Sequence, residues 1–210
     1  YQPLTPQQRQ AAADIDAGTG VGAPIAELLV RRHVGTARQA EQFFAPALAD
    51  LHDPFLMPGM DKAVHRLNKA MGAKERIMIY GDYDVDGTTA VALVYKYLQN
   101  YYSNIEYYIP TRYEEGYGIS RKSIDYAAER GIRLVIVLDC GIKAIEEIAY
   151  AKSRGIDFII CDHHVPDPEL PPAVAILNPK MQGSTYPCKH LSGRGVGYKN
   201  MKTFATSHGM

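Results

Sequence analysis

Three apolar stretches of the sequence each run into a carboxylate, and these carboxylates are the side chains best placed to do chemistry. The stretches end at Asp82, Asp139 and Asp162. Short β-branched runs that alternate with helical patterns predict buried strands of a parallel sheet, which binds ligands beyond the carboxyl ends of its strands. Carboxylates crowded at one edge repel each other unless a cation lies between them. The sequence therefore predicts one or two divalent cations at this edge.

The first stretch leads into segment 81–87, which reads Gly-Asp-Tyr-Asp-Val-Asp-Gly. Alternate residues of an extended chain face the same side, so Asp82, Asp84 and Asp86 are expected to offer oxygen ligands at one point. The same spacing opens a calcium-binding EF-hand loop, but Leu93 stands where that loop needs a bidentate glutamate. A helix is expected to follow, and the free N–H groups at its start could bind a phosphate.

The two later stretches supply Asp139 and the run Asp162-His163-His164. Asp139 alone could equally cap the following helix, so its significance comes from convergence with the other carboxylates. Histidine nitrogen beside carboxylates suits manganese, iron or zinc better than calcium. Neighbouring side chains diverge in extended chain, which indicates a metal contact for His163 and a substrate-phosphate or supporting contact for His164. A surface histidine pair at a strand end is the alternative.

The segment 110–118 follows the second predicted strand and so opens at the same edge of the sheet. Arg112 could bind a substrate phosphate through its planar guanidinium, and the nearby tyrosines could stack on bases. The alternative is an internal ion pair between Arg112 and Glu114 or Glu115. A later glycine-rich segment, 193–197, lacks the spacing of a nucleotide-binding loop and is interpreted as a turn that could contact phosphate.

An alternation of strands and helices is expected to position these residues. From residue 75 onward the pattern predicts an α/β fold, with a mainly parallel twisted sheet flanked by helices. Residues 1–74 are expected to form a helical N-terminal segment packed on that core, in which Thr36 caps a short helix. The predicted strands are 76–82, 105–110, 132–139, 156–162 and a short one at 173–177, and the predicted helices are 88–99, 120–130 and 143–154.

The composition narrows the class of protein. No apolar run approaches the roughly 20 residues that cross a bilayer, and the polar start has no signal-peptide pattern, so a cytoplasmic protein is expected. The 23 basic and 23 acidic residues balance to a net charge of zero, which argues against tight independent DNA binding. The three cysteines show no metal-binding spacing, and Cys140 and Cys161 are expected to be reduced core residues.

Taken together, the three motifs resemble the DHH phosphoesterase superfamily. They read Asp-Tyr-Asp-Val-Asp-Gly, Leu-Asp-Cys-Gly and Asp-His-His, at 82–87, 138–141 and 162–164. Within that superfamily, the form of the first motif, segment 112–118 and the Leu-Ser-Gly-x-Gly-Val run at 191–196 are similar to the RecJ family of single-stranded-DNA-specific exonucleases. Segments 26–29 and 51–55 are similar as well, so the resemblance covers nearly the whole chain.

The resemblance implies stepwise hydrolysis of single-stranded DNA from its 5′ end with two manganese or magnesium ions, in DNA repair and recombination. His164 and Asp162 would be catalytic, with His164 on the scissile phosphate, and Arg112 would bind the substrate. The implied partners are single-stranded DNA and a single-stranded-DNA-binding protein, with no membrane. The implied metal ligands are Asp82, Asp84, Asp86, Asp139 and His163.

The chain departs from the family pattern at its end. Family members carry a further metal-binding aspartate and more domains beyond the 191–196 motif, so residues 75–210 are expected to be a truncated DHH domain with weak activity. Two alternatives stay open. A phosphodiesterase of short oligonucleotides or cyclic dinucleotides is disfavoured because those relatives typically begin the first motif with histidine. A non-catalytic DHH-fold module that binds DNA or a replication partner is disfavoured because the first three motifs are intact.

Overall fold

A computed structural model of the chain describes residues 2–209 and divides after Leu51 into two compact units. The first unit contains helices α1 (Pro6–Thr19), α2 (Ala23–Arg31) and α3 (Ala37–Phe44), with a short 3₁₀ helix at Leu48–Asp50. Thr36 caps α3 as predicted, because its hydroxyl accepts the N–H of Gln39. The small core of this unit consists of Ala12, Ile15, Ala26, Leu29, Val30 and Ala40.

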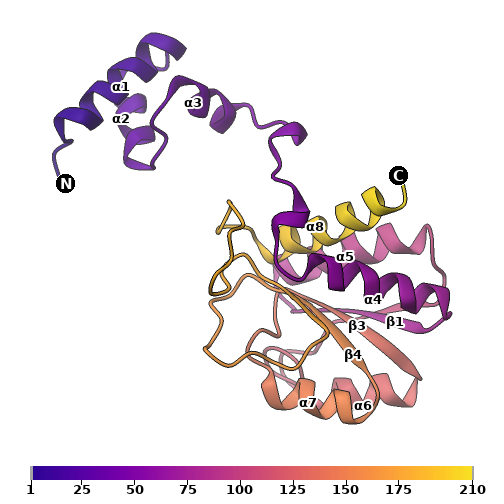
Figure 1. Cartoon of the computed structure of the whole chain (residues 1–210). Coiled ribbons are helices and arrows are strands. Elements are labelled where there is room, and N and C mark those ends of the chain that lie inside the picture. The colour runs from indigo at the N-terminus through magenta and orange to yellow at the C-terminus, as the bar shows by residue number, and fades with distance from the viewer. Residues whose placement is uncertain (1, 210) are drawn as a thin grey trace. The chain divides into compact units, whose positions relative to one another are not determined.

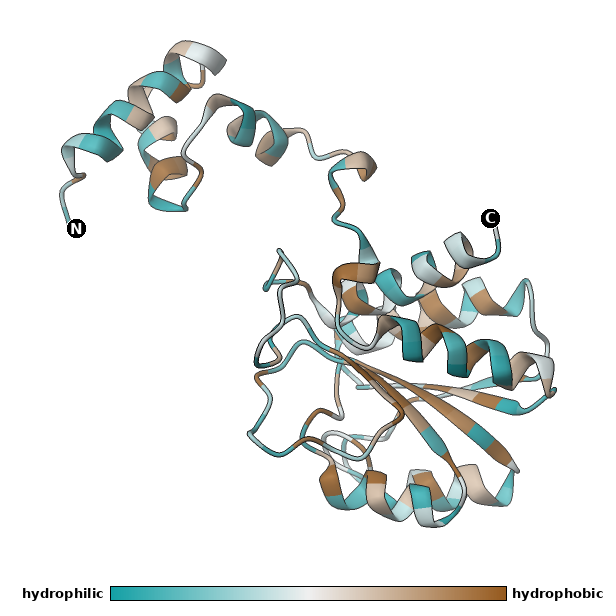
Figure 2. Cartoon of the chain, viewed as in Figure 1, coloured by the Kyte–Doolittle hydropathy of each residue, from teal (hydrophilic) through white to brown (hydrophobic). Residues whose placement is uncertain are grey.

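A five-stranded sheet forms the centre of the second unit, in the order β2-β1-β3-β4-β5. All neighbouring strands are parallel, which confirms the predicted α/β fold. The inner strands are apolar along most of their length (Figure 2), as expected for strands covered on both faces. The strands are β1 (Arg76–Gly81), β2 (Ile105–Tyr108), β3 (Ile132–Leu138), β4 (Asp157–Cys161) and β5 (Ala175–Leu177).

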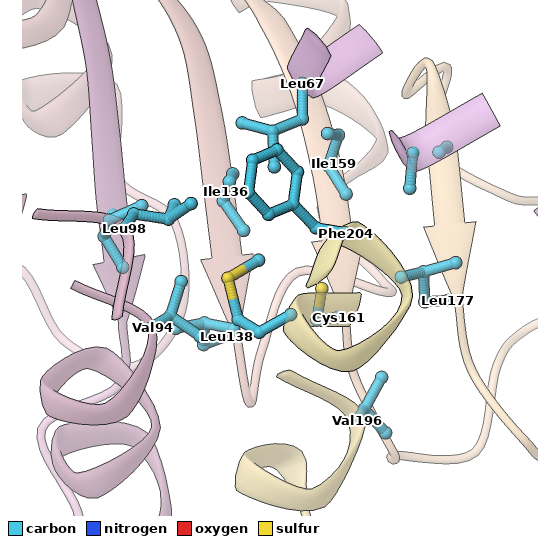
Figure 3. Close-up of a cluster of buried hydrophobic side chains, with 14 of the residues drawn as sticks. Leu67, Val94, Leu98, Ile136, Leu138, Ile159, Cys161, Leu177, Val196 and Phe204 are labelled. Atoms are coloured by element: carbon cyan, nitrogen blue, oxygen red, sulfur yellow. The ribbon is translucent and has the colours of Figure 1, made fainter. Parts of the chain in front are cut away.

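Helices cover both faces of this sheet (Figure 1). One face packs against α4 (Met60–Gly72), α5 (Val85–Gln99) and α8 (Gly193–Ser207), and the other against α6 (Arg121–Glu129) and α7 (Ile145–Ser153). Figure 3 shows Phe204 of α8 beside Leu67 and Ile159, inside the first of these layers. Cys140 and Cys161 are buried in the cores of opposite faces, as predicted. No helix within residues 2–209 is long and apolar enough to cross a membrane.

The division of the chain falls earlier than the predicted boundary near residue 74. Helix α4 belongs to the second unit, because Met60, Leu67 and Ala70 are buried in the core between the sheet and the layer of α4, α5 and α8. A short 3₁₀ helix, Pro54–Leu56, precedes α4 in the same unit. The helical pattern before residue 74 therefore contains two different packing environments, which sequence periodicity alone does not separate.

The glycine-rich segment 193–197 was predicted to be a turn, and this prediction is wrong. It forms the first turns of α8, a 15-residue helix. Ser192 caps the helix by accepting the N–H of Gly195 at 3.1 Å. Glycine disfavours helix by about 1 kcal/mol per residue relative to alanine, which is why local propensity pointed away from a helix here.

Candidate active site

The register of the sheet places three carboxylates at one edge. The last residues of β1, β3 and β4 pair with one another across the sheet. The next residue after each strand is an aspartate, and Asp82, Asp139 and Asp162 are each no more than 2% exposed. The predicted acidic strand ends therefore meet, because parallel strands that end level bring their following residues side by side.

Asp84 and Asp86 lie at this edge, but the secondary structure that places them there differs from the prediction. Strand β1 ends at Gly81 and helix α5 begins at Val85, so the chain is not extended as far as Asp86. Asp84 is the N-cap of α5, and its carboxylate accepts the N–H of Gly87 at 2.8 Å. Asp86 lies in the first turn of the helix. A helix start, rather than alternation along a strand, brings these two carboxylates to the site.

Asp139 and His163 form the centre of a group of candidate metal ligands. His163 Nε2 lies 3.1 Å from Asp139 Oδ1 and 3.9 Å from Asp86 Oδ2. One ligand atom from each of Asp139, His163 and His164 lies within 4.8 Å of the other two. Asp139 Oδ1 is buried and accepts no hydrogen bond from any residue of the range 2–209. A buried carboxylate oxygen that accepts no hydrogen bond and faces an imidazole nitrogen fits a divalent cation such as manganese.

The electrostatics of the site also favour a cation. Burial, followed by the charges of Asp86, Asp84 and Asp162, raises the pKa of Asp139 to about 8. Burial likewise raises the pKa of Asp82. Both shifts mean that the ionised carboxylates are unfavourable without a positive partner, and a bound divalent cation would supply one.

The start of α8 forms a further wall of the site, which the sequence prediction missed. The N–H groups of Gly193 and Arg194 donate to the two oxygens of Asp86, at 2.7 and 2.9 Å. A Cβ atom added to Gly193 would lie 2.4 Å from Asp139 Oδ1, so only glycine fits here. Asp139 itself has a left-handed backbone with φ of 62°, a conformation that aspartate tolerates better than most residues. A serine cap before the glycine was the available signal.

Asp162 is held by hydrogen bonds from the loops beside it. Its Oδ2 accepts the N–H of Ile142 at 3.0 Å, and its Oδ1 accepts the N–H groups of His163 and His164 at 2.7 and 3.1 Å. The same Oδ1 lies 2.7 Å from His164 Nδ1. On the far side of this imidazole, Nε2 lies 3.4 Å from the Tyr117 hydroxyl. Asp162 thus fixes the ring of His164, and the two histidines make different contacts.

Arg112 lies exposed on the loop after β2, with its guanidinium carbon 5.6 Å from the centre of the Tyr83 ring. The alternative of an internal Arg–Glu pair is not formed within the described part of the chain. Glu114 pairs instead with Lys122 at 2.6 Å, and Glu115 accepts hydrogen bonds from neighbouring hydroxyl groups. The arginine is therefore held next to the first acidic motif through the tyrosine ring.

Comparison with known proteins places this arrangement in a family. Residues 76–209 match the model of the DHH family, N-terminal domain. The chain belongs to the DHH family. DHH proteins similar to it include the single-stranded-DNA-specific exonuclease RecJ of Bacillus subtilis (strain 168), 46% identical over 175 residues, which cover 83% of this chain and 22% of that protein. RecJ of Escherichia coli (strain K12) is 34% identical over 194 residues, covering 92% and 34%.

Two solved structures of RecJ proteins are also similar to this chain. The crystal structure of exonuclease RecJ bound to manganese is similar over 73% of this chain and 39% of that one, with 28% identity and a TM-score of 0.67. RecJ of Thermus thermophilus in complex with Mn²⁺ has a TM-score of 0.76 at 23% identity, covering 100% of this chain and 28% of that one. At 23% identity, this second similarity supports the fold alone. The chain spans between 22% and 34% of the length of the curated relatives named above.

Proposed function

We propose that this chain is the N-terminal catalytic part of a RecJ-like exonuclease that hydrolyses single-stranded DNA from its 5′ end with two manganese or magnesium ions, in DNA repair and recombination. The observation that carries the proposal is the buried oxygen of Asp139, which faces His163 Nε2 and accepts no hydrogen bond in the described chain. The similarity to RecJ proteins supports the substrate class. The proposed setting is the cytoplasm.

Asp139 lies near the charges of Asp86 and Asp84 and 3.1 Å from His163 Nε2, so it is proposed as the central ligand. When bound, the cations would neutralise the phosphate and activate a water for attack on it. The protein's own contribution is to hold the ligands still before the substrate arrives, through the α5 cap and the donors from α8. The proposed ligands are Asp82, Asp84, Asp86, Asp139 and His163.

His164 and Asp162 are proposed to act on the substrate side of the site. Asp162 fixes His164 through Nδ1, which leaves Nε2 pointing to the side where Tyr117 lies. We propose that Nε2 contacts an oxygen of the scissile phosphate. In this scheme Asp162 is a positioning residue, because the loop N–H groups and the imidazole occupy its oxygens.

The proposed function is tested by following nucleotide release from end-labelled DNA. With Mn²⁺ present, we expect mononucleotides from the 5′ end of single strands and much slower release from duplex. A chelator should stop the release, and Asp86→Asn should reduce both release and Mn²⁺ binding measured by calorimetry. Cleavage of only dinucleotides or cyclic dinucleotides would point to the alternative phosphodiesterase. If the wild-type chain binds Mn²⁺ but hydrolyses no DNA, the catalytic assignment for this chain is overturned.

Arg112→Lys should raise the KM for single-stranded DNA by about tenfold with a smaller effect on kcat. Lysine keeps the charge but cannot form the two parallel hydrogen bonds of a guanidinium to phosphate, nor stack as well on Tyr83. Arg121→Lys is the matched control, since Arg121 also lies over a tyrosine ring, at 5.4 Å, but on helix α6. Equal kinetics for the two variants would remove Arg112 from the substrate site.

The net charge of zero gives the chain little general attraction for phosphate. We therefore extend the proposal to a protein partner that binds single-stranded DNA and delivers the strand. Such delivery would replace the electrostatic steering that strongly basic nucleases obtain from their own surfaces.

A further inference from the structure

A pocket of about 310 Å³ adjoins the candidate active site on the side of helix α7. Its walls come from the loops that follow β2, β3 and β4, so it opens at the same edge of the sheet as the proposed metal ligands. It shares Asp162 and His164 with the active site, and most of its other residues have no part in the proposed hydrolysis. Its lining also includes Tyr117, Ile119, Ile142, Lys143 and Glu147.

The inner surface of the pocket suits a flat aromatic ring. Ile119 and Ile142 line the pocket from the core, and at 8% and 1% exposed they present only a small part of their apolar surface to it. Tyr117 and His164 stand edge to face, with ring centres 6.2 Å apart and planes 81° apart. Apolar surface beside aromatic rings is the usual setting for a stacked nucleobase. A phosphate would lose its hydration there, and the lysine at the border, Lys143, is already paired with Asp167.

Besides Asp162, whose oxygens already contact Ile142 and His164, two charged side chains border the pocket. Lys143 Nζ lies 3.2 Å from Asp167 Oδ1, so its charge is already paired. Glu147 is half-buried in the first turn of α7, and its carboxylate forms no hydrogen bond or ion pair with any other residue of the range 2–209. A carboxylate accepts hydrogen bonds and donates none. It therefore favours the edge of a base that presents an amino group.

We propose that this pocket receives the nucleobase of the nucleotide whose phosphate is cleaved, and that Glu147 favours bases with an exocyclic amino group over thymine. The proposal rests on the proposed function, since it takes the strand to be the substrate at His164. Guanine offers two adjacent donors to a carboxylate, whereas the single ring N–H of thymine is flanked by carbonyl oxygens that repel it. The order of preference should therefore run from guanine, as the best, to thymine, as the poorest.

The test is a titration of the whole chain, with labelled isoleucine methyl groups followed by NMR in Mg²⁺. The probes are dGMP, dTMP and deoxyribose 5-phosphate, which lacks a base. We expect dGMP to shift the methyl signals of Ile119 and Ile142, with an affinity at least about fivefold higher than that of dTMP, the size of one net hydrogen bond. Deoxyribose 5-phosphate should leave these methyl groups unmoved.

Glu147→Gln should reduce the dGMP preference to less than about twofold, because it removes the negative charge and keeps the shape of the side chain. Glu146→Gln is the matched control, since Glu146 lies in the same turn of α7 but is exposed and outside the pocket. The control should keep the full preference. Loss of the preference in both variants would mean that the charge of the helix start, not Glu147, selects the base.

Failure of this proposal is distinguishable from failure of the proposed function. If DNA is not hydrolysed but dGMP shifts the two methyl groups and dTMP does so more weakly, the pocket assignment stands and the exonuclease assignment falls. If DNA is hydrolysed but no nucleotide moves either methyl group, or if deoxyribose 5-phosphate moves them equally, the pocket does not take a base and the proposal is overturned.

Discussion

Replacing Asp139 with asparagine should abolish metal-dependent hydrolysis, with a loss of at least about a thousandfold, while making the metal-free protein more stable. Asparagine has the same shape and accepts the left-handed backbone at φ of 62°, so the fold should persist. It lacks the negative charge that the proposed cations need. Activity on end-labelled single strands at saturating Mn²⁺ measures the first effect, and turnover close to wild type would reject the role of Asp139.

The stability effect of this substitution depends on pH in a defined direction. The pKa of Asp139 is raised to about 8 in the folded protein, against about 3.9 in an unfolded chain. Between these values the folded state binds the additional proton, so the free energy of unfolding of the metal-free protein falls as pH rises from about 4 to about 8. Asparagine is neutral throughout and should remove this fall.

Thermal unfolding in chelator at pH 5 and pH 9 measures the difference. At pH 9 the Asp139→Asn protein should be more stable by at least about 1 kcal/mol, or roughly 2–4 °C in Tm for a chain of this length. At pH 5 the two proteins should differ less. Asp125→Asn is the control, since Asp125 forms an exposed ion pair with Arg154 at 3.4 Å, worth less than about 1 kcal/mol. A wild-type Tm independent of pH would contradict the protonation of Asp139.

Gly193→Ala should weaken Mn²⁺ binding at least about tenfold and reduce hydrolysis at least about a hundredfold, the loss that a small displacement of catalytic groups can cause. The new methyl group would lie 2.4 Å from Asp139 Oδ1, so either the aspartate or the start of α8 must move. Movement of α8 would also break the hydrogen bonds that Gly193 and Arg194 donate to Asp86.

Helix propensity alone predicts the opposite result, since alanine is favoured over glycine in a helix by about 1 kcal/mol. Gly72→Ala is therefore a suitable control: it introduces the same change in α4, where no atom outside the adjoining backbone lies within 4 Å of the added Cβ. That variant should bind Mn²⁺ like the wild type. Calorimetric titration of both variants decides the matter, and unchanged binding by Gly193→Ala would show that the contact with Asp139 can relax.

The strands were predictable because their signal is local. Strand β3, for example, was expected at 132–139 and is found at Ile132–Leu138, since an unbroken β-branched run between two helical patterns has few other interpretations. The meeting of Asp82, Asp139 and Asp162 followed from the same pattern, because parallel strands leave only one edge for their carboxyl ends.

The parts that were not predictable depend on contacts between distant segments. The alternation of Asp84 and Asp86 fits a strand and a helix start equally well, and only the structure shows the cap to Gly87. Glycine at position 193 looked like a turn residue because the reason for it is Asp139, 54 positions earlier in the chain. Local propensity carries no information about such an approach.

Strands β1, β3 and β4 end at the same level of the sheet, and this common end can preserve the site while the protein's sequence changes. Neighbouring strands lie about 4.8 Å apart, a spacing set by backbone hydrogen bonds and not by any particular side chain. The separation between Asp82, Asp139 and Asp162 is therefore set by the spacing of the strands. Substitutions in the apolar core that preserve strand pairing can accumulate without altering that separation, whereas a one-residue slip of a single strand would turn its aspartate to the other face.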